Sequence, residues 1–285
     1  MKPISFGIKT APQHTTYQAM LRVWKQVDEN PAFTHAWLFD HYAPIFSDIN
    51  GPCLEGWTTL AAFAAETSRI RLGLMVTGNT YRHPAVLASI AATVDIISDG
   101  RLDLGIGAGW NEYEHNSMGI PLYAPGERIR RLDESCQIIK QLFTQELTTF
   151  AGRYYQLQEA RREPKPVQKP HPPFVIGGSG EKLTLRVVAK HASIWNYVNG
   201  PVEDFKRKVD ILAQHCEAVG TDVQKIDLST QVRIDYEDLA EAAKRTKTFI
   251  DAGANHFVYT LTAPYPEDIV SRIEKEVVEA VLGSD

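Results

Sequence analysis

The sequence has few of the features that mark secreted, membrane-spanning or nucleic-acid-binding proteins. It contains only three cysteines, an odd number without a CxxC pair, so a disulfide framework is not expected. No uninterrupted apolar run approaches the roughly 18–20 residues of a membrane span, and the N-terminal MKPISFGIKT has no long apolar signal core. Basic runs are absent and the formal net charge is −5. These absences predict a cytoplasmic protein whose partners include neither nucleic acid nor a membrane.

Several catalytic motifs are also missing. The nine histidines show no HExxH or comparable spacing, so no metal site is expected. No GxSxG segment points to a hydrolase. The glycines Gly105, Gly107 and Gly109 do not complete a GxGxxG dinucleotide fingerprint, because Trp110 or Glu112 stands where the third glycine is needed.

What the sequence does contain is a regular alternation of strand and helix patterns. Eight strands are expected at Ser5–Ile8, Ala36–Phe39, Arg71–Met75, Leu102–Ile106, Pro173–Ile176, Ala192–Trp195, Leu228–Val232 and His256–Tyr259. Eight helices are expected at Tyr17–Val27, Thr58–Thr67, Pro84–Ile97, Glu127–Phe143, Glu181–Lys190, Glu203–Val219, Leu239–Ala252 and Glu267–Leu282. Strict alternation favours a closed (β/α)8 TIM barrel, formed as a single domain over residues 1–285, over an open doubly wound sheet.

Two segments add to the minimal barrel. Asn111–Pro125 is a long polar and aromatic connection, which we expect to cover the barrel mouth as a lid loop. Thr148–Leu157 is typical of two short strands that turn at Ala151-Gly152-Arg153. We interpret this small hairpin as an appendage on the barrel wall.

The loops after the strands indicate where the active site lies, because ligands of parallel α/β folds bind at the carboxyl ends of the strands. Asp40 and His41 directly follow the second strand, where an acid next to an imidazole is suited to proton transfer. In this interpretation the carboxylate fixes the tautomer of the histidine or raises its pKa. The alternative is that the pair only caps the following turn.

The segment from Gly177 to Lys182 follows the fifth strand and precedes a helical pattern. Free backbone N–H groups at such a position can hold a phosphate, with the Ser179 hydroxyl and the Lys182 charge assisting. The alternative is a tight turn in which Ser179 is the N-cap of the helix.

Six short motifs occur in order along nearly the whole chain. They are Asp40-His41, VTGNTYRHPA at Val76–Ala85, SDGRLDLGIGAGW at Ser98–Trp110, YAPGERIRRLDE at Tyr123–Glu134, GRYYQL at Gly152–Leu157 and PHPPFVIGGSGEKLTLR at Pro170–Arg186. Together they resemble the bacterial luciferase-like family of flavin- and deazaflavin-dependent oxidoreductases, whose fold is a (β/α)8 barrel. Within that family the pattern is most similar to the branch that uses coenzyme F420.

The resemblance implies a role for each matching position. Asp40 corresponds to the acid near the deazaflavin, and His41 corresponds to a histidine that donates or accepts a proton. Thr77 is similar to a loop residue that contacts the ring system, and Met75–Val76 aligns with a bulge where the family often has a non-prolyl cis peptide.

Two glycine-containing turns are also implied to contact the cofactor. Ala108 and Gly109 match the turn beside the cofactor after the fourth strand. The phosphate-binding turn is matched by Gly177, Gly178, Ser179 and Gly180.

The resemblance therefore predicts hydride transfer between coenzyme F420 and a small organic substrate, carried out by a homodimer. Two alternatives remain open: an FMN-dependent monooxygenase that uses molecular oxygen, and a flavin-binding barrel without turnover. Sugar-phosphate dehydrogenases of the family carry a glutamate where Trp110 stands, so a sugar phosphate is not the expected substrate. The aromatic residues Trp110, Tyr113, Tyr42 and Trp195 predict an apolar or planar pocket instead.

Overall fold

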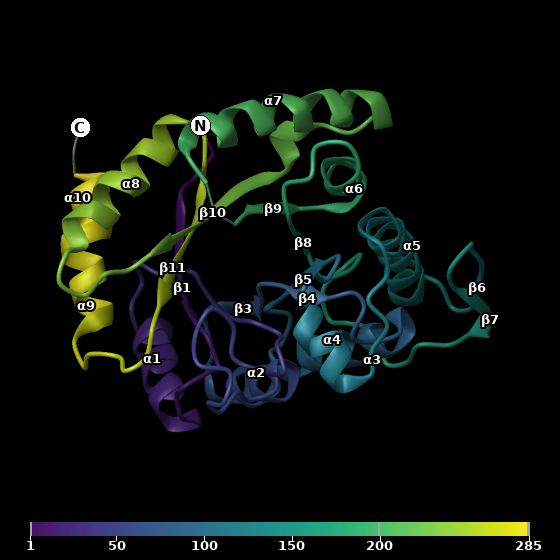
Figure 1. Ribbon diagram of the computed structural model, residues 1–285, viewed down its shortest axis with the longest axis horizontal. Helices are drawn as coiled ribbons and strands as arrows, with labels where there is room; N and C mark the ends of the chain where they lie inside the picture. The colour runs from purple at the N-terminus through teal and green to yellow at the C-terminus, as the bar shows by residue number, and fades with distance from the viewer. Residues whose placement is uncertain (1, 199, 284–285) are drawn as a thin grey trace.

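Eight parallel strands close into a barrel in the computed structural model, which describes residues 2–198 and 200–283 (Figure 1). The barrel strands are β1 (Ser5–Thr10), β2 (His35–Leu38), β3 (Arg71–Leu74), β5 (Leu102–Gly107), β8 (Phe174–Gly177), β9 (Ile194–Tyr197), β10 (Asp227–Arg233) and β11 (His256–Leu261). The ring closes where β3 pairs with β5, with Leu72 opposite Leu102 and Gly73 opposite Asp103. A two-residue strand, β4 (Thr77–Gly78), continues along β5. The predicted TIM barrel and its eight strands are confirmed.

Helices surround the strands as an outer layer (Figure 1). They are α1 (Tyr17–Glu29), α2 (Gly56–Glu66), α3 (Pro84–Ile97), α5 (Pro125–Thr144), α6 (Thr184–His191), α7 (Val202–Val219), α8 (Leu239–Asp251), α9 (Ile269–Ile273) and α10 (Ala280–Leu282), with a 3-10 turn η1 (Val223–Lys225) and a π-helical stretch η2 (Glu274–Glu279). Side-chain caps at Thr16, Glu55, His83 and Asp238 satisfy backbone N–H groups in first turns, and Pro84 suits the start of α3.

The start of α6 differs from the prediction. This helix begins at Thr184, three residues later than expected, and its N-cap is Leu183, which makes no side-chain capping bond. Ser179 is therefore not an N-cap, because three turn residues separate the glycine segment from the first helical residue.

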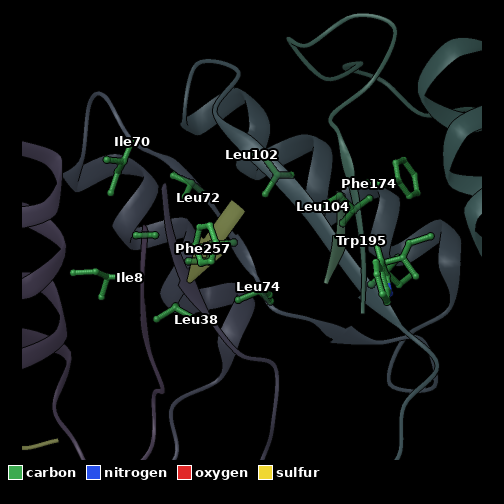
Figure 2. Packing of buried hydrophobic residues seen from close by; sticks show 14 of the residues in the cluster. Ile8, Leu38, Ile70, Leu72, Leu74, Leu102, Leu104, Phe174, Trp195 and Phe257 are labelled. Atoms are coloured by element: carbon green, nitrogen blue, oxygen red, sulfur yellow. The ribbon is translucent and has the colours of Figure 1, made fainter. Parts of the chain in front are cut away.

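Strand side chains alternate between the helix layer and the barrel interior. Ile8, Leu38, Leu74, Phe174 and Trp195 face outward and pack with helix residues in the main core (Figure 2). A smaller interior cluster, separate from that core, contains Trp37, Met75, Val175, Ile194 and Val258. This period of two follows from the geometry of the extended chain, and it decides which strand residues can reach the cavity described below.

Glycines inside the barrel permit close approaches. A Cβ atom on Gly7 would lie 1.8 Å from Nδ1 of His35, and one on Gly105 would lie 1.8 Å from the carbonyl oxygen of Leu74. Larger residues at either position would collide with the neighbouring strand, so this close approach requires glycine.

The two predicted additions have different outcomes. Strands β6 (Thr148–Ala151) and β7 (Gln156–Ala160) form the expected antiparallel hairpin, which lies beyond α5 at the edge of the molecule (Figure 1). The Asn111–Pro125 connection, in contrast, is not an open lid loop. It contains a helix, α4 (Glu112–Met118), whose Glu114 and His115 side chains are fully buried. Across the described parts of the chain, none of the helices has both the length and the apolar character that crossing a bilayer requires.

Candidate functional site

A cavity of about 430 Å³ opens at the carboxyl ends of the barrel strands. Nine of the residues predicted for the site line this cavity: Asp40, His41, Met75, Val76, Thr77, Ala108, Gly109, Gly177 and Gly178. The other two, Ser179 and Gly180, belong to the same turn but do not line it. Glycine and alanine positions thus form one wall, where a flat ligand can contact backbone without side-chain obstruction.

The peptide bond between Met75 and Val76 is cis. It joins the end of β3 to β4, at the bulge that the resemblance predicts. Both residues line the cavity, and the Val76 side chain lies close to Gly107 and Gly177, since a Cβ atom on either glycine would fall within 3.1 Å of it.

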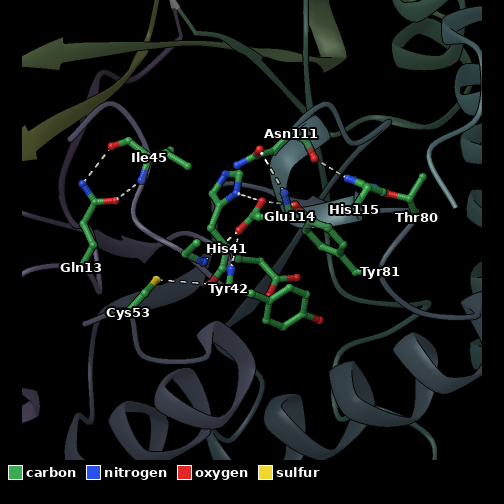
Figure 3. Close-up of polar contacts among 12 residues, drawn as sticks. Gln13, His41, Tyr42, Ile45, Cys53, Thr80, Tyr81, Asn111, Glu114 and His115 are labelled. Carbon is green, nitrogen blue, oxygen red and sulfur yellow. Dashed lines mark hydrogen bonds and ion pairs between the residues drawn. The ribbon is translucent and has the colours of Figure 1, made fainter. Parts of the chain in front are cut away.

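His41 forms a buried hydrogen bond with a carboxylate from another element. Its Nδ1 lies 2.7 Å from Oε2 of Glu114, which projects from α4 (Figure 3). Tyr81 donates its hydroxyl to the same oxygen over 2.6 Å. The other oxygen, Oε1, accepts the backbone N–H groups of Tyr42 and Ala43. Four donors therefore converge on one carboxylate.

This surrounding fixes the charge of Glu114 and the tautomer of His41. Burial by itself would raise the pKa of Glu114, but hydrogen bonds from His41 and Tyr81 outweigh it, and the pKa is lowered. An ionised Glu114 accepts only, so Nδ1 of His41 carries the proton that is shared between them. The other ring nitrogen, Nε2, has no hydrogen-bond partner in the described part of the chain, and His41 borders the cavity. His41 can therefore take up or release a proton at Nε2.

Asp40 has a different partner from the one expected. Its two carboxylate oxygens accept hydrogen bonds from Arg82, over 2.5 and 3.1 Å, and the guanidinium also reaches Glu55 over 2.6 Å. Burial raises the pKa of Asp40, although Arg82 acts in the opposite direction. The expectation that Asp40 orients His41 is wrong, because both oxygens of Asp40 accept from Arg82, whereas Nδ1 of His41 bonds to Glu114. Glu114 orients His41 instead. The expected place of Asp40 beside the cofactor ring stays a prediction.

The glycine turn after β8 partly fits a phosphate cradle. Gly178 has a φ of +119°, a conformation that favours glycine, and its N–H bonds to the carbonyl of Asn196. The N–H groups of Ser179 and Gly180 have no such partner within the described residues. Across the cavity mouth, Arg128 donates to the carbonyl of Gly109, while its buried Nε lacks a partner among the described residues.

The aromatic lining is only partly the one expected. Trp110 borders the cavity, stacked on Phe46 with ring centroids 5.6 Å apart, whereas Tyr42 and Tyr113 do not border it. Trp195 is also absent from the lining, because strand alternation turns it outward onto Phe205. Phe39, Phe46 and Tyr81 supply the remaining aromatic lining, so the apolar character of the pocket is as predicted although most of the contributing residues differ.

Sequence reasoning missed four charged residues near the cavity: Lys9, Arg82, Glu114 and Arg128. Glu114 and Arg128 lie in or just after the connection interpreted as a lid, where no strand end marks them. Arg82 stands within a motif quoted above, and its pairing with Asp40 joins elements 42 residues apart. Within the described ranges, no group of three or more His, Cys, Asp or Glu side chains could hold a metal ion.

Comparison with known proteins shows relatives that use two kinds of cofactor. An F420-dependent glucose-6-phosphate dehydrogenase from Kineococcus radiotolerans is 29% identical over 86% of this chain and 72% of its own length. An FMNH(2)-dependent dimethylsulfone monooxygenase from Pseudomonas putida is 31% identical, over 58% of this chain and 45% of its own length.

A solved structure has the same fold. An F420-dependent secondary alcohol dehydrogenase, in complex with an F420-acetone adduct, superimposes with a TM-score of 0.86 over 98% of this chain and 99% of that chain, at 18% identity. The model of the family described as luciferase-like monooxygenase matches residues 4–277. With this match, the sequence resemblance is confirmed: the chain belongs to the luciferase-like monooxygenase family and is an oxidoreductase.

Proposed function

We propose that the protein is a coenzyme F420-dependent oxidoreductase that transfers a hydride between the deazaflavin and a small organic substrate. The observation that carries this proposal is the buried pair of His41 and Glu114 beside a cavity walled by glycine backbone. Relatives named as F420-dependent dehydrogenases support the choice of cofactor, and a structure with the same fold holds an F420-acetone adduct.

The residues present fit a flat cofactor with a phosphate. Gly107, Gly109 and Gly177 line the cavity, so backbone faces a ligand there. Side chains are excluded at two of these positions, because a Cβ atom on Gly107 would lie 2.8 Å from Val76 and one on Gly109 would lie 2.4 Å from Thr80. At the cavity mouth, the unpaired Nε of Arg128 adds positive charge. When bound, the deazaflavin supplies or accepts the hydride at its C5 carbon.

The chain's own residues handle the proton and the orientation. Hydride addition to a carbonyl carbon leaves negative charge on its oxygen, which needs a proton, and His41 can supply it from Nε2. Glu114 holds the imidazole in position through its hydrogen bond with Nδ1. The Asp40–Arg82 pair joins the loop after β2 to the segment that precedes α3.

Glucose 6-phosphate is not the substrate that we propose, although a relative is named for that activity. Trp110 stands where that class of enzyme has a glutamate, and it forms an aromatic wall with Phe46. A homodimer, a cytoplasmic location and a single domain over residues 1–285 stay predictions.

The choice of cofactor can be measured directly. We expect coenzyme F420 to bind the apoprotein at least about tenfold more tightly than FMN, which corresponds to ~1.4 kcal/mol. Parallel fluorescence titrations measure both affinities under one set of conditions. Equal or tighter binding of FMN, together with oxygen-dependent turnover, would favour the FMN-dependent monooxygenase, which the dimethylsulfone monooxygenase relative represents. Binding of either cofactor without turnover on any tested substrate would favour the non-catalytic barrel.

The glycine turn provides a second test. At Gly178, with φ +119°, a side chain is strained and would approach Thr184, so Gly178→Val should weaken binding of coenzyme F420 by at least about tenfold. Gly220→Ala is the matched control, because Gly220 also has positive φ, at +76°, but lies at the end of α7 with nothing within 4 Å of the added carbon. If Gly178→Val binds the cofactor as the wild type does, the phosphate is held elsewhere.

A further inference from the structure

Lys9 lies at the floor of the cavity, on the inward face of β1. Its neighbours Ile8 and Thr10 are buried on the other face, as strand alternation requires. Lys9 is half-buried and borders the cavity together with Asn196 and Gln231. These three residues come from β1, β9 and β10, an arc of the barrel that lies between β2, which leads to Asp40 and His41, and β8, which leads to the glycine turn.

A chain of hydrogen bonds aims one oxygen at the Lys9 ammonium. Its Nζ donates to Oε1 of Gln231 over 2.6 Å, and the amide nitrogen of Gln231 donates to Oδ1 of Asn196 over 2.9 Å. Asn196 in turn donates to the hydroxyl of Ser229 over 3.0 Å. Because the amide nitrogen of Gln231 donates to Asn196, its oxygen must face Lys9. Lys9 therefore contacts a neutral oxygen and not a carboxylate.

The ammonium has no countercharge from the protein. Over the described residues, no carboxylate forms an ion pair with Lys9, and its only side-chain acceptor is the Gln231 amide. An ammonium carries three N–H donors, so two remain for a ligand. Removal from water lowers the pKa of Lys9 to about 8, which leaves it predominantly charged at neutral pH. A half-buried cation that has no protein anion beside it is partly removed from water, which costs free energy, and the missing anion is the feature that needs explanation.

The rest of the cavity indicates what kind of anion would fit. Phe39, Ile45, Phe46 and Trp110 give apolar and aromatic walls, which favour a hydrocarbon or planar group. The single ammonium at the cavity floor balances one negative charge. A dianion would leave its second negative charge unbalanced and removed from water, which is unfavourable. A monocarboxylate with an apolar body satisfies both conditions.

We propose that Lys9 binds the carboxylate of the substrate, so that the protein acts on apolar or aromatic carboxylic acids that also carry the group to be reduced or oxidised. This inference rests on the proposed function, because the substrate is placed relative to the cofactor position assumed there. Lys9 is a specificity-determining residue in this role, since it holds the carboxylate while His41 serves the reacting oxygen. The reduced ring of the cofactor also carries negative charge, and the experiment must separate these two sources.

The test measures binding of benzoate to the apoprotein by calorimetry, with benzamide as the neutral analogue of the same shape. We expect benzoate to bind at least about tenfold more tightly than benzamide. In Lys9→Met, which keeps the length but removes the charge, this preference should disappear. In Gln231→Glu, a protein carboxylate occupies the place beside Lys9, so benzoate binding should weaken by a similar factor. Lys206→Met, an exposed position on α7, is the control and should keep the preference.

A separate titration with coenzyme F420 distinguishes the sources of the charge. Unchanged cofactor affinity in Lys9→Met supports the substrate site, whereas a loss of about tenfold or more would assign Lys9 to the cofactor and overturn the proposal. Equal binding of benzoate and benzamide to the wild type would overturn it as well, as would tighter binding of phenyl phosphate than of benzoate. Because the benzoate titration uses apoprotein, it can succeed even if coenzyme F420 fails to bind.

Discussion

Replacing His41 with alanine should lower turnover by about 10²–10⁴-fold, the usual contribution of general acid–base catalysis. Cofactor affinity should change far less, because the His41 ring borders the cavity while the proposed cofactor wall is mostly glycine backbone. The measurement is oxidation of reduced coenzyme F420 by a carbonyl compound that the wild type reduces, with binding followed separately by cofactor fluorescence.

Two further results would show whether His41 moves a proton or only supports the site. Added imidazole should restore part of the turnover of His41→Ala, because it can enter the space that the variant opens and act as the proton donor. Glu114→Gln, which keeps the shape but replaces the carboxylate that fixes the His41 tautomer with an amide, should lower turnover without abolishing cofactor binding. Unaltered turnover in His41→Ala would exclude this histidine from the mechanism.

Replacing Arg82 with methionine should destabilise the protein by about 3–5 kcal/mol at neutral pH, because it leaves a buried carboxylate without its countercharge. The side chain of Asp40 is fully buried, and that of Arg82 is only 12% exposed. Glu55 contributes less, since its side chain is 34% exposed and water screens it. The measurement is denaturant unfolding of both proteins, compared as the difference in free energy of unfolding.

The pH dependence of that difference identifies Asp40 as its cause. Burial already raises the pKa of Asp40, and loss of Arg82 removes the main effect that opposes it. Asp40 in the folded variant then binds a proton more readily than it does in the unfolded chain. The loss of stability relative to the wild type should therefore be largest above the folded pKa of Asp40. It should shrink as the pH falls toward the pKa of an aspartate in the unfolded chain, about 3.9.

A double variant provides the control for Arg82→Met. Asp40→Asn combined with Arg82→Met removes both charges, so it should be more stable than Arg82→Met alone at neutral pH and should lose the pH dependence. A loss below about 1 kcal/mol in Arg82→Met, typical of exposed ion pairs, would show that the pair is not buried in solution.

The positions of the strands were predictable because they depend on local patterns. Runs such as Leu102–Gly107 and Phe174–Gly177 are apolar, short and bounded by turn residues, so they indicate buried parallel strands without knowledge of their neighbours. Errors arose where the exact start of a helix is not marked by the pattern: α6 begins at Thr184 rather than Glu181, and no side chain caps its first turn. Helix α4 was missed because seven residues give too few turns for a clear period.

The sequence by itself determined the barrel, the family and the wall of the cavity that glycines and Thr77 form, since these follow from residue order along strands and the turns after them. Only the tertiary structure decided the charged partnerships. Glu114 reaches His41 across 73 residues, Arg82 reaches Asp40 across 42, and Lys9 meets Gln231 across 222. The physical reason is that pairing of charges depends on distance in space, which barrel closure sets, whereas strand and helix formation depends on neighbours in sequence. The same closure leaves Lys9 without a carboxylate at the cavity floor.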